Sequence, residues 1–196
     1  MRCLVLAFGG LLLAGSAGAV TVPSSGVLAF DVMREGSDIG DHRYTFRDDG
    51  EALSVQVETD VAVKLPLIGV TVYRFEHESH ETWQDGRLSA LRSTTNDDGQ
   101  AHQVDLADAE GFPASLWNDA ILRQTVLLNT VDGRSMAASA IDVGPETVQA
   151  NGKTVPAHHY RLSGDLTRDL WYDASGMLVK VAFTADDGSH IEYTLK

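Results

Sequence analysis

Apolar and polar residues alternate with a period of two along most of the chain from residue 26 onward. The clearest stretch is 53–65. Its apolar parity holds Leu53, Val55, Val57, Val61, Val63 and Leu65, and its polar parity holds Ser54, Gln56, Glu58, Asp60 and Lys64. Because successive side chains of a strand point to opposite faces, this pattern predicts a strand with one buried face and one solvated face. At about 3.3 Å per residue such a strand would be about 43 Å long, which favours a large, curved sheet.

The following stretch, 70–83, is predicted to be a strand with an unusual inner face. Tyr73, Phe75 and Trp83 share one parity, and so do the polar residues His77, Ser79 and Glu81. Nine further strands are predicted at 28–33, 39–46, 88–95, 102–106, 134–143, 154–162, 169–172, 178–184 and 190–195. Asx-Gly and similar turn signals separate most of them, at 35–36, 48–50, 85–86, 97–99, 132–133, 151–152, 175–176 and 186–188. Hairpins of this kind pair antiparallel.

One segment departs from the period of two. Asn118 is a good helix N-cap, Asp119 suits the helix dipole, and apolar residues follow at near-helical spacing. We therefore predict a helix over 118–129. The predicted fold is mainly β: a long curved antiparallel sheet, an open or half β-barrel of about 10 to 11 strands, with one helix on the concave side.

Composition and charge limit the classes of partner. The chain has 196 residues, of which 43% are hydrophobic, and its 28 acidic and 15 basic residues give a net charge of −13. We expect a single β-rich domain over 26–196. A surface this acidic repels phosphate backbones, so nucleic acid is not expected as a partner.

The first residues have the pattern of a secretory signal peptide. Arg2 supplies a basic start, 4–13 is a short apolar stretch, and Ala17-Gly18-Ala19 resembles a cleavage site. We predict cleavage after residue 19, a periplasmic location and no transmembrane segment in the mature chain. The single cysteine, Cys3, would be removed with the signal peptide, so the exported domain would have no disulfide, thiolate metal site or cysteine nucleophile.

Local motifs for catalysis or metal binding are not evident. His77 and His80 are three apart, which puts them on opposite faces of a strand, although a zinc site from separate strands, such as His77 with His42 or His102, stays open. The Asp-Asp-Gly turns lack the ligand ladder of a calcium loop. We predict no catalytic residues, no metal and no cofactor.

Large apolar side chains offer one candidate site. A curved sheet covered by a helix leaves a concave space in which an apolar or lipid-like ligand could bind. On this hypothesis residues 109–118 form a hinge and lid; the alternative for the same side chains is ordinary core packing. The candidate binding residues are Tyr73, Phe75, Trp83, Trp117, Leu122, Val126 and Trp171.

Two sequence stretches carry a resemblance to a known group. Leu170-Trp171-Tyr172-Asp173-Ala174-Ser175-Gly176, continuing through Leu178-Val179-Lys180-Val181-Ala182-Phe183, resembles the C-terminal signature of uncharacterised exported proteins of (proteo)bacteria. Val72-Tyr73-Arg74-Phe75 followed by Trp83-Gln84-Asp85-Gly86-Arg87-Leu88 resembles them too, and the similarity spans Leu28 to Leu195. A more distant resemblance, in strand order and size, is to the periplasmic lipoprotein carriers LolA and LolB, which implies an unclosed barrel with a plugged concavity.

Three functions follow as hypotheses. The first is a non-enzymatic periplasmic domain that binds an apolar or amphipathic ligand between sheet and helix. The second is an envelope protein interaction or structural module with a filled core. The third and least favoured is a hydrolase whose residues come from separate strands.

Overall fold

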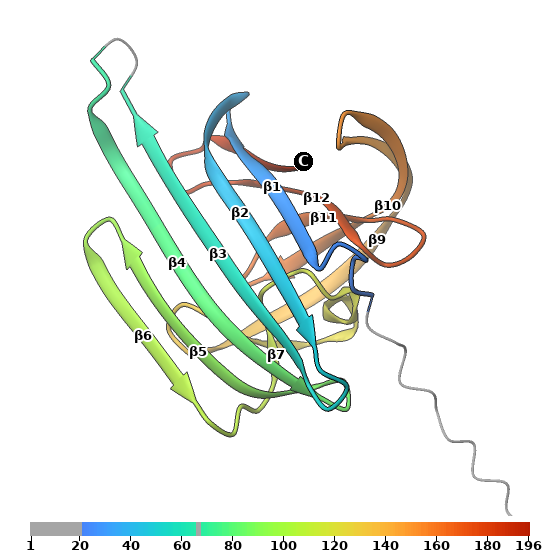
Figure 1. The fold of residues 1–196 in the computed structure, drawn as a ribbon. Helices are drawn as coiled ribbons and strands as arrows, with labels where there is room; N and C mark the ends of the chain where they lie inside the picture. The colour runs from blue at the N-terminus through green and yellow to red at the C-terminus, as the bar shows by residue number, and fades with distance from the viewer. Residues whose placement is uncertain (1–20, 66–67) are drawn as a thin grey trace, which may run out of the picture.

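The computed structural model describes residues 21–65 and 68–196, so the predicted signal peptide lies outside it. Within these residues, thirteen strands form one curved sheet in the order β6-β5-β4-β3-β2-β1-β13-β12-β11-β10-β9-β8-β7 (Figure 1). The strands are β1 (Val27–Arg34), β2 (Ser37–Asp48), β3 (Leu53–Lys64), β4 (Thr71–Gln84), β5 (Arg87–Asp97), β6 (Gln100–Leu106), β7 (Phe112–Pro113), β8 (Val126–Leu128), β9 (Ser135–Ala150), β10 (Lys153–Gly164), β11 (Arg168–Tyr172), β12 (Leu178–Thr184) and β13 (His190–Leu195). The predicted mainly-β fold with a long curved open sheet is confirmed.

All eleven strands predicted from the sequence are present, and β7 and β8 are additional. The largest difference in length is at β9, which continues past the predicted end at residue 143 to Ala150. At the predicted end the register between β9 and β10 shifts, between His159 and Tyr160, as at a β-bulge, and the pairing then continues. Asn151 and Gly152, with φ of 51° and 65°, then make the tight turn between the two strands.

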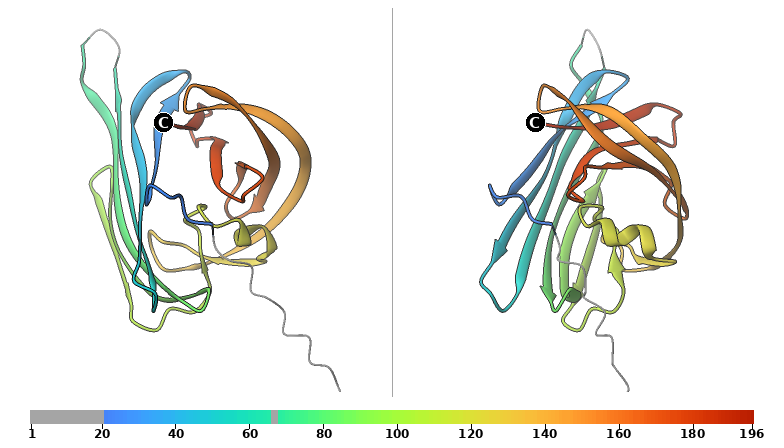
Figure 2. Two further views of the ribbon diagram at one scale, coloured as in Figure 1. Left: turned by 45° about the vertical axis from the view of Figure 1, so that its right-hand side comes forward. Right: turned by 90° about the vertical axis from the view of Figure 1, so that its right-hand side faces the viewer.

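The pairing of the first strand with the last joins the two halves of the open sheet. β1 pairs antiparallel with both β2 and β13, and this joins the first six strands to the last strands. The long β9–β10 hairpin curls round the C-terminal strands (Figure 2). Only the two-residue pair of β7 with β8 is parallel among the described strands.

The concave side of the sheet holds the main hydrophobic core, to which both halves contribute. Its largest side chains that are almost completely buried include Phe30, Tyr44, Trp117 and Ile121. A second, smaller cluster on the opposite side of β11 and β12 contains Val148, Ala150, Ala157, Trp171, Val179 and Ala182. The curled hairpin supplies three of these, so the hairpin covers the outer face of the C-terminal strands.

The predicted helix over 118–129 is wrong in its extent. Only Asp119–Arg123 is helical, as a single 3₁₀ turn, η1, and residues 126–128 form β8. The start was identified correctly: the Asn118 side chain accepts a hydrogen bond from the Ala120 N–H at 3.0 Å. The end was not, because the short apolar run Val126–Leu128 fits a helix or a strand equally well, and its pairing with β9 decided the outcome. The plug on the concave side is therefore one helical turn flanked by two short strands.

Candidate functional site

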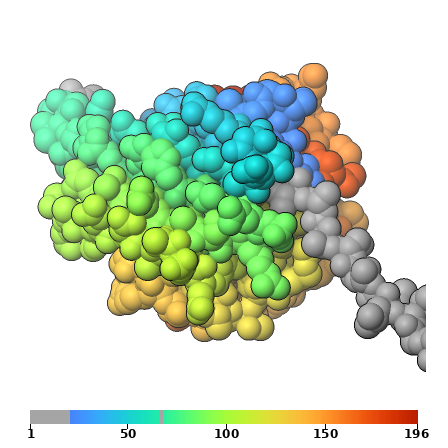
Figure 3. Space-filling model, turned by 60° about the horizontal axis from the view of Figure 1, so that its bottom comes forward, coloured from blue at the N-terminus to red at the C-terminus, as the bar shows by residue number. Residues whose placement is uncertain are grey.

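An open groove of about 990 Å³ lies at the end of the molecule where β4 and β5 meet the segment that contains β7 and η1. Figure 3 views the molecule from this end, where the green strands meet the yellow segment. Trp83, Leu88, Phe112 and Val126 are its large apolar lining residues. The ring of Trp83 contacts that of Phe112 edge to face, with centroids 5.4 Å apart. The groove therefore has an aromatic floor.

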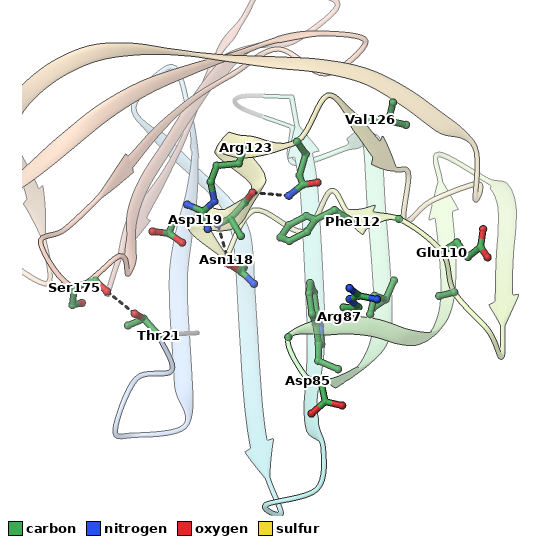
Figure 4. A pocket seen from close by; sticks show the side chains of 17 residues that line it. Thr21, Asp85, Arg87, Glu110, Phe112, Asn118, Asp119, Arg123, Val126 and Ser175 are labelled. Atoms are coloured by element: carbon green, nitrogen blue, oxygen red, sulfur yellow. Dashed lines mark hydrogen bonds between the residues drawn. The ribbon is translucent and has the colours of Figure 1, made fainter. Parts of the chain in front are cut away.

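Charged side chains surround that floor. Arg87 and Arg123 are basic, and Asp85, Glu110 and Asp119 are acidic. In Figure 4, Phe112 and Arg87 lie centrally, with Asp119 and Arg123 to one side and Glu110 to the other. Among the described residues, none of these five takes part in an ion pair within 4.0 Å. The charges thus remain available to a ligand, and the lining as a whole is amphipathic.

The beginning of the described chain borders the groove. The Thr21 hydroxyl donates a hydrogen bond of 2.5 Å to the Ser175 carbonyl in the β11–β12 turn, and both residues line the groove (Figure 4). The predicted cleavage after residue 19 would make Val20, the residue directly before Thr21, the N-terminus.

A buried carboxyl group forms the wall behind the groove. Glu81 has no exposed surface, and its Oε2 accepts hydrogen bonds from the indole N–H groups of Trp83 at 2.8 Å and Trp117 at 3.1 Å. Its Oε1 has no hydrogen-bond partner among the described residues. Burial raises the pKa of Glu81 above its ordinary value of 4.5, and the nearby Ser115 side chain and the two indole donors oppose this rise only in part.

The segment proposed as a lid is instead fixed in the core. Trp117 is 2% exposed, and its backbone neighbours are held from two sides: the Tyr172 hydroxyl donates to the Leu116 carbonyl at 2.7 Å, and the Tyr44 hydroxyl donates to the Ser115 carbonyl. In addition, the Ala114 N–H donates to the Leu128 carbonyl. Residues 109–118 are thus a packed part of the fold rather than a free lid.

The predicted site residues fall in five places, of which the last, that of Trp171, lies outside the concave space. Trp83 and Val126 line the groove, whereas Trp117 is buried behind it and Leu122 packs against the same core. Phe75 lines a smaller chamber nearer the other end of the concave face. Tyr73 is 38% exposed near the start of β4, where its hydroxyl donates to Asp97 at 2.9 Å.

Trp171 does not belong to the concave space at all. Its neighbours Leu170 and Tyr172 face the main core, and alternation along β11 sends Trp171 to the other side. There it stacks on His159, with centroids 4.2 Å apart, and donates to Glu146 at 2.8 Å. The polar residues that share the inner face of β4, His77, Ser79 and Glu81, were the sequence signal for a polar interior, but the list of candidate binding residues did not include them.

The histidines and carboxylates of the described residues do not form a metal site. The described residues contain no group of three or more His, Cys, Asp or Glu side chains placed to hold a metal ion. His42 and His77 each bond a threonine hydroxyl, at 2.7 Å, and neither bonds a carboxylate.

In residues 21–65 and 68–196, no helix has both the length and the hydropathy that a membrane crossing requires.

Comparison with known proteins places this fold. A search of curated proteins finds no match. One similar solved structure is a "Beta-barrel-like Protein of Domain of Unknown Function DUF1849 from Brucella abortus", with a TM-score of 0.51 and 12% sequence identity over 87% of this chain and 94% of that one. At this identity the similarity shows the fold alone. The family described as "Domain of unknown function (DUF6134)" matches residues 30–196, and the chain belongs to that family.

Proposed function

We propose that the protein is an exported, periplasmic binding domain that takes an amphipathic, lipid-like ligand in the groove. The observation that carries this proposal is the lining itself, in which an apolar floor built on Trp83 and Phe112 is edged by charges that form no ion pair within the described residues. Small-molecule sites commonly have volumes of about 300–1,000 Å³ and combine apolar walls with a few polar groups. The groove is at the upper end of this size range, and its lining is about evenly polar and apolar.

The filled core redefines the original hypothesis. A ligand cannot lie deep between sheet and helix, because Trp117 and Ile121 occupy that space and are buried. The groove lies at the end of the concave face, between the ends of β4 and β5 and η1, and it is open to solvent. The distant resemblance to LolA and LolB supports an apolar ligand, and the mixed charges favour a head group that hydrogen bonds or is zwitterionic.

Fluorescence of a lipophilic probe such as N-phenyl-1-naphthylamine tests the proposal. Val126 is 54% exposed and lines the groove, so Val126→Glu places a charge on the apolar lining at little cost to folding. Ile141 is 58% exposed on β9 and outside the groove, which makes Ile141→Glu a matched control. We expect the first variant to weaken probe binding by about tenfold and the second to leave it unchanged. Equal binding by both variants would refute the groove as the site.

The location has its own test. N-terminal sequencing of the protein recovered from a periplasmic extract should begin at Val20, the residue after the predicted cleavage site. A chain that retains residues 1–19 in the extract, or that stays in the cytoplasm, would contradict the export proposal.

One observation favours the second candidate, an envelope protein interaction module. The β3–β4 hairpin projects beyond the rest of the sheet (Figure 1). Its described tip exposes large apolar side chains at Leu65, Ile68, Val70, Val72 and Tyr73. Contiguous exposed apolar surface of this kind is typical of a protein contact. A photo-crosslinker at position 68 should give a discrete adduct in cells, and the same group at position 141 should not; no adduct at 68 would argue against this candidate.

A further inference from the structure

A second cavity, the chamber, lies on the concave face away from the groove and has a volume of about 130 Å³. Its polar lining residues are His42, Tyr44, Thr59, His77, Ser79, Ser115, Thr130, Arg168 and Tyr193. Trp83, Trp117 and Glu81, which form the wall behind the groove, are not among its lining residues. Phe75, His77, Arg168 and Tyr193 keep part of their surface exposed, so a small molecule can reach the chamber from solvent.

The sheet register places two histidines in one row of the chamber wall. His42 on β2 lies opposite Thr59 on β3, which lies opposite His77 on β4, which in turn lies opposite Thr95 on β5. Each Nδ1 is 2.7 Å from a threonine hydroxyl, His42 from Thr59 and His77 from Thr95. These bonds fix both rings and leave each Nε2 free of the threonines.

Two buried polar atoms of the wall lack a partner. His42 is 8% exposed and Ser79 is completely buried, and neither the His42 Nε2 nor the Ser79 Oγ has a hydrogen-bond partner among the described residues. Most buried polar side-chain atoms in proteins do have a partner. Leaving two of them unpaired costs stability, so this part of the wall has a polar character that the described residues do not satisfy by themselves.

Arg168 brings a positive charge to the chamber without a carboxylate to balance it. Its guanidinium lies 3.7 Å from the centroid of the Phe183 ring, and its Nη1 donates to the Thr167 carbonyl at 2.8 Å. In the described part of the chain no carboxylate pairs with it within 4.0 Å, and Asp186 acts on it only from a longer range. Five other described arginines are paired with a carboxylate, Arg34, Arg74, Arg92, Arg134 and Arg161, whereas Arg43, Arg47, Arg87 and Arg123, like Arg168, are not.

The absence of acids from the wall is selective. The chain carries 28 acidic residues and a net charge of −13, yet no Asp or Glu lines the chamber. The uncharged lining includes aromatic and aliphatic side chains such as Phe75, Val57 and Leu166. One guanidinium charge in such a place matches a monoanion with an apolar carbon part, because a dianion would leave one negative charge uncompensated inside an acidic protein.

We propose that the chamber binds a carboxylate, held by Arg168 and hydrogen-bonded by Tyr193 and by His77, the partly exposed member of the histidine row. The planar guanidinium fork matches the two oxygens of a carboxylate. The source is either a small free carboxylic acid or the head group of a longer fatty acid. This site is separate from the groove, so the proposal stands or falls independently of the proposed function.

Calorimetric titration with sodium butyrate and sodium laurate, with inorganic phosphate as a third ligand, tests the chamber. We expect one butyrate per chain and weaker or no binding of phosphate. Tighter binding of laurate identifies a fatty-acid head group as the source, and equal binding identifies a small free acid. Tighter binding of phosphate than of both carboxylates, or no carboxylate binding, would overturn the proposal.

Variants locate the binding. Arg168→Gln should weaken butyrate binding by about tenfold or more, the effect expected for losing a charge-assisted hydrogen bond. Tyr193→Phe removes only the hydroxyl and should weaken binding by about fivefold, which keeps the test valid if the arginine variant folds poorly. Arg92→Gln, on an exposed arginine of β5 outside the chamber, is the control and should bind like the wild type. Unchanged binding by both chamber variants would refute the site, and the probe-binding results with Val126→Glu have no bearing on it.

Discussion

The buried carboxyl group of Glu81 makes a specific prediction about stability and pH. Glu81→Gln keeps a side-chain oxygen for the two indole donors of Trp83 and Trp117 and removes the ionisable group. Because burial raises the pKa of Glu81 above 4.5 in the folded state, the folded protein binds more protons than the unfolded chain above that pH. The carboxyl group therefore stabilises the fold less and less as the pH rises from 4.5 through the folded-state pKa.

The magnitude follows from the linkage between protonation and folding. The free energy of unfolding of Glu81→Gln minus that of the wild type should be small below pH 4.5 and should rise by up to about 1.4 kcal/mol per pH unit above it. It should level off where the pH passes the folded-state pKa of Glu81. Glu81→Leu, in contrast, leaves two buried N–H donors without an acceptor and should cost about 2–6 kcal/mol, from about 1–3 kcal/mol for each donor.

Urea unfolding at a series of pH values from about pH 4 to about pH 8 measures these differences. Using the difference from the wild type removes the contributions of other titrating groups. Glu78→Gln is the matched control, because Glu78 lies on the opposite, exposed face of β4 and bonds Gln56 and His80 there. A difference for Glu81→Gln that does not vary with pH, or that falls as the pH rises, would refute the reasoning.

Three further predictions concern other parts of the fold. Burial lowers the pKa of His42 to about 3, so between pH 6.5 and pH 4 the unfolded chain binds a proton at this residue that the folded state does not. Over this range the free energy of unfolding of the wild type should therefore fall by about 3 kcal/mol more than that of His42→Phe, as measured by urea unfolding. An equal fall in the variant would contradict this. Gly40 has φ +148°, and the Cβ of an alanine at this position would lie 2.0 Å from a backbone oxygen of β3. Gly40→Ala should therefore lower the Tm by about 10 °C more than the control Gly50→Ala, whose Cβ would meet nothing within 4 Å. Similar Tm values for the two variants by calorimetry would contradict this. Trp171→Phe removes the indole bond to the half-exposed Glu146 and should cost about 1 kcal/mol in urea unfolding, and no change would show that this bond adds nothing.

Part of the candidate site could be read from the sequence and part could not. The alternation in β4 put His77, Ser79 and Glu81 on the same face as Trp83, and the structure has them facing the interior. No sequence signal connected Arg168 with these residues, because it begins a strand far along the chain, and only the joining of β1 to β13 brings the C-terminal strands over β2 to β5. Grouping Trp171 with the pocket failed for a local reason, since its parity on β11 is opposite to that of Leu170.

Local sequence patterns were enough to predict most of the strands and their turns, because a period of two and Asx-Gly turns are properties of a few successive residues. The tertiary structure decided what depends on distant partners. Residues 126–128 became a strand because β9 offered its backbone, and the concave space was filled by Trp117 and Ile121 instead of staying open. The curvature of the sheet also left an amphipathic groove at one end and a chamber without acidic lining residues elsewhere on the inner face. The lining of each comes from segments that are far apart in the sequence and meet only in the folded sheet.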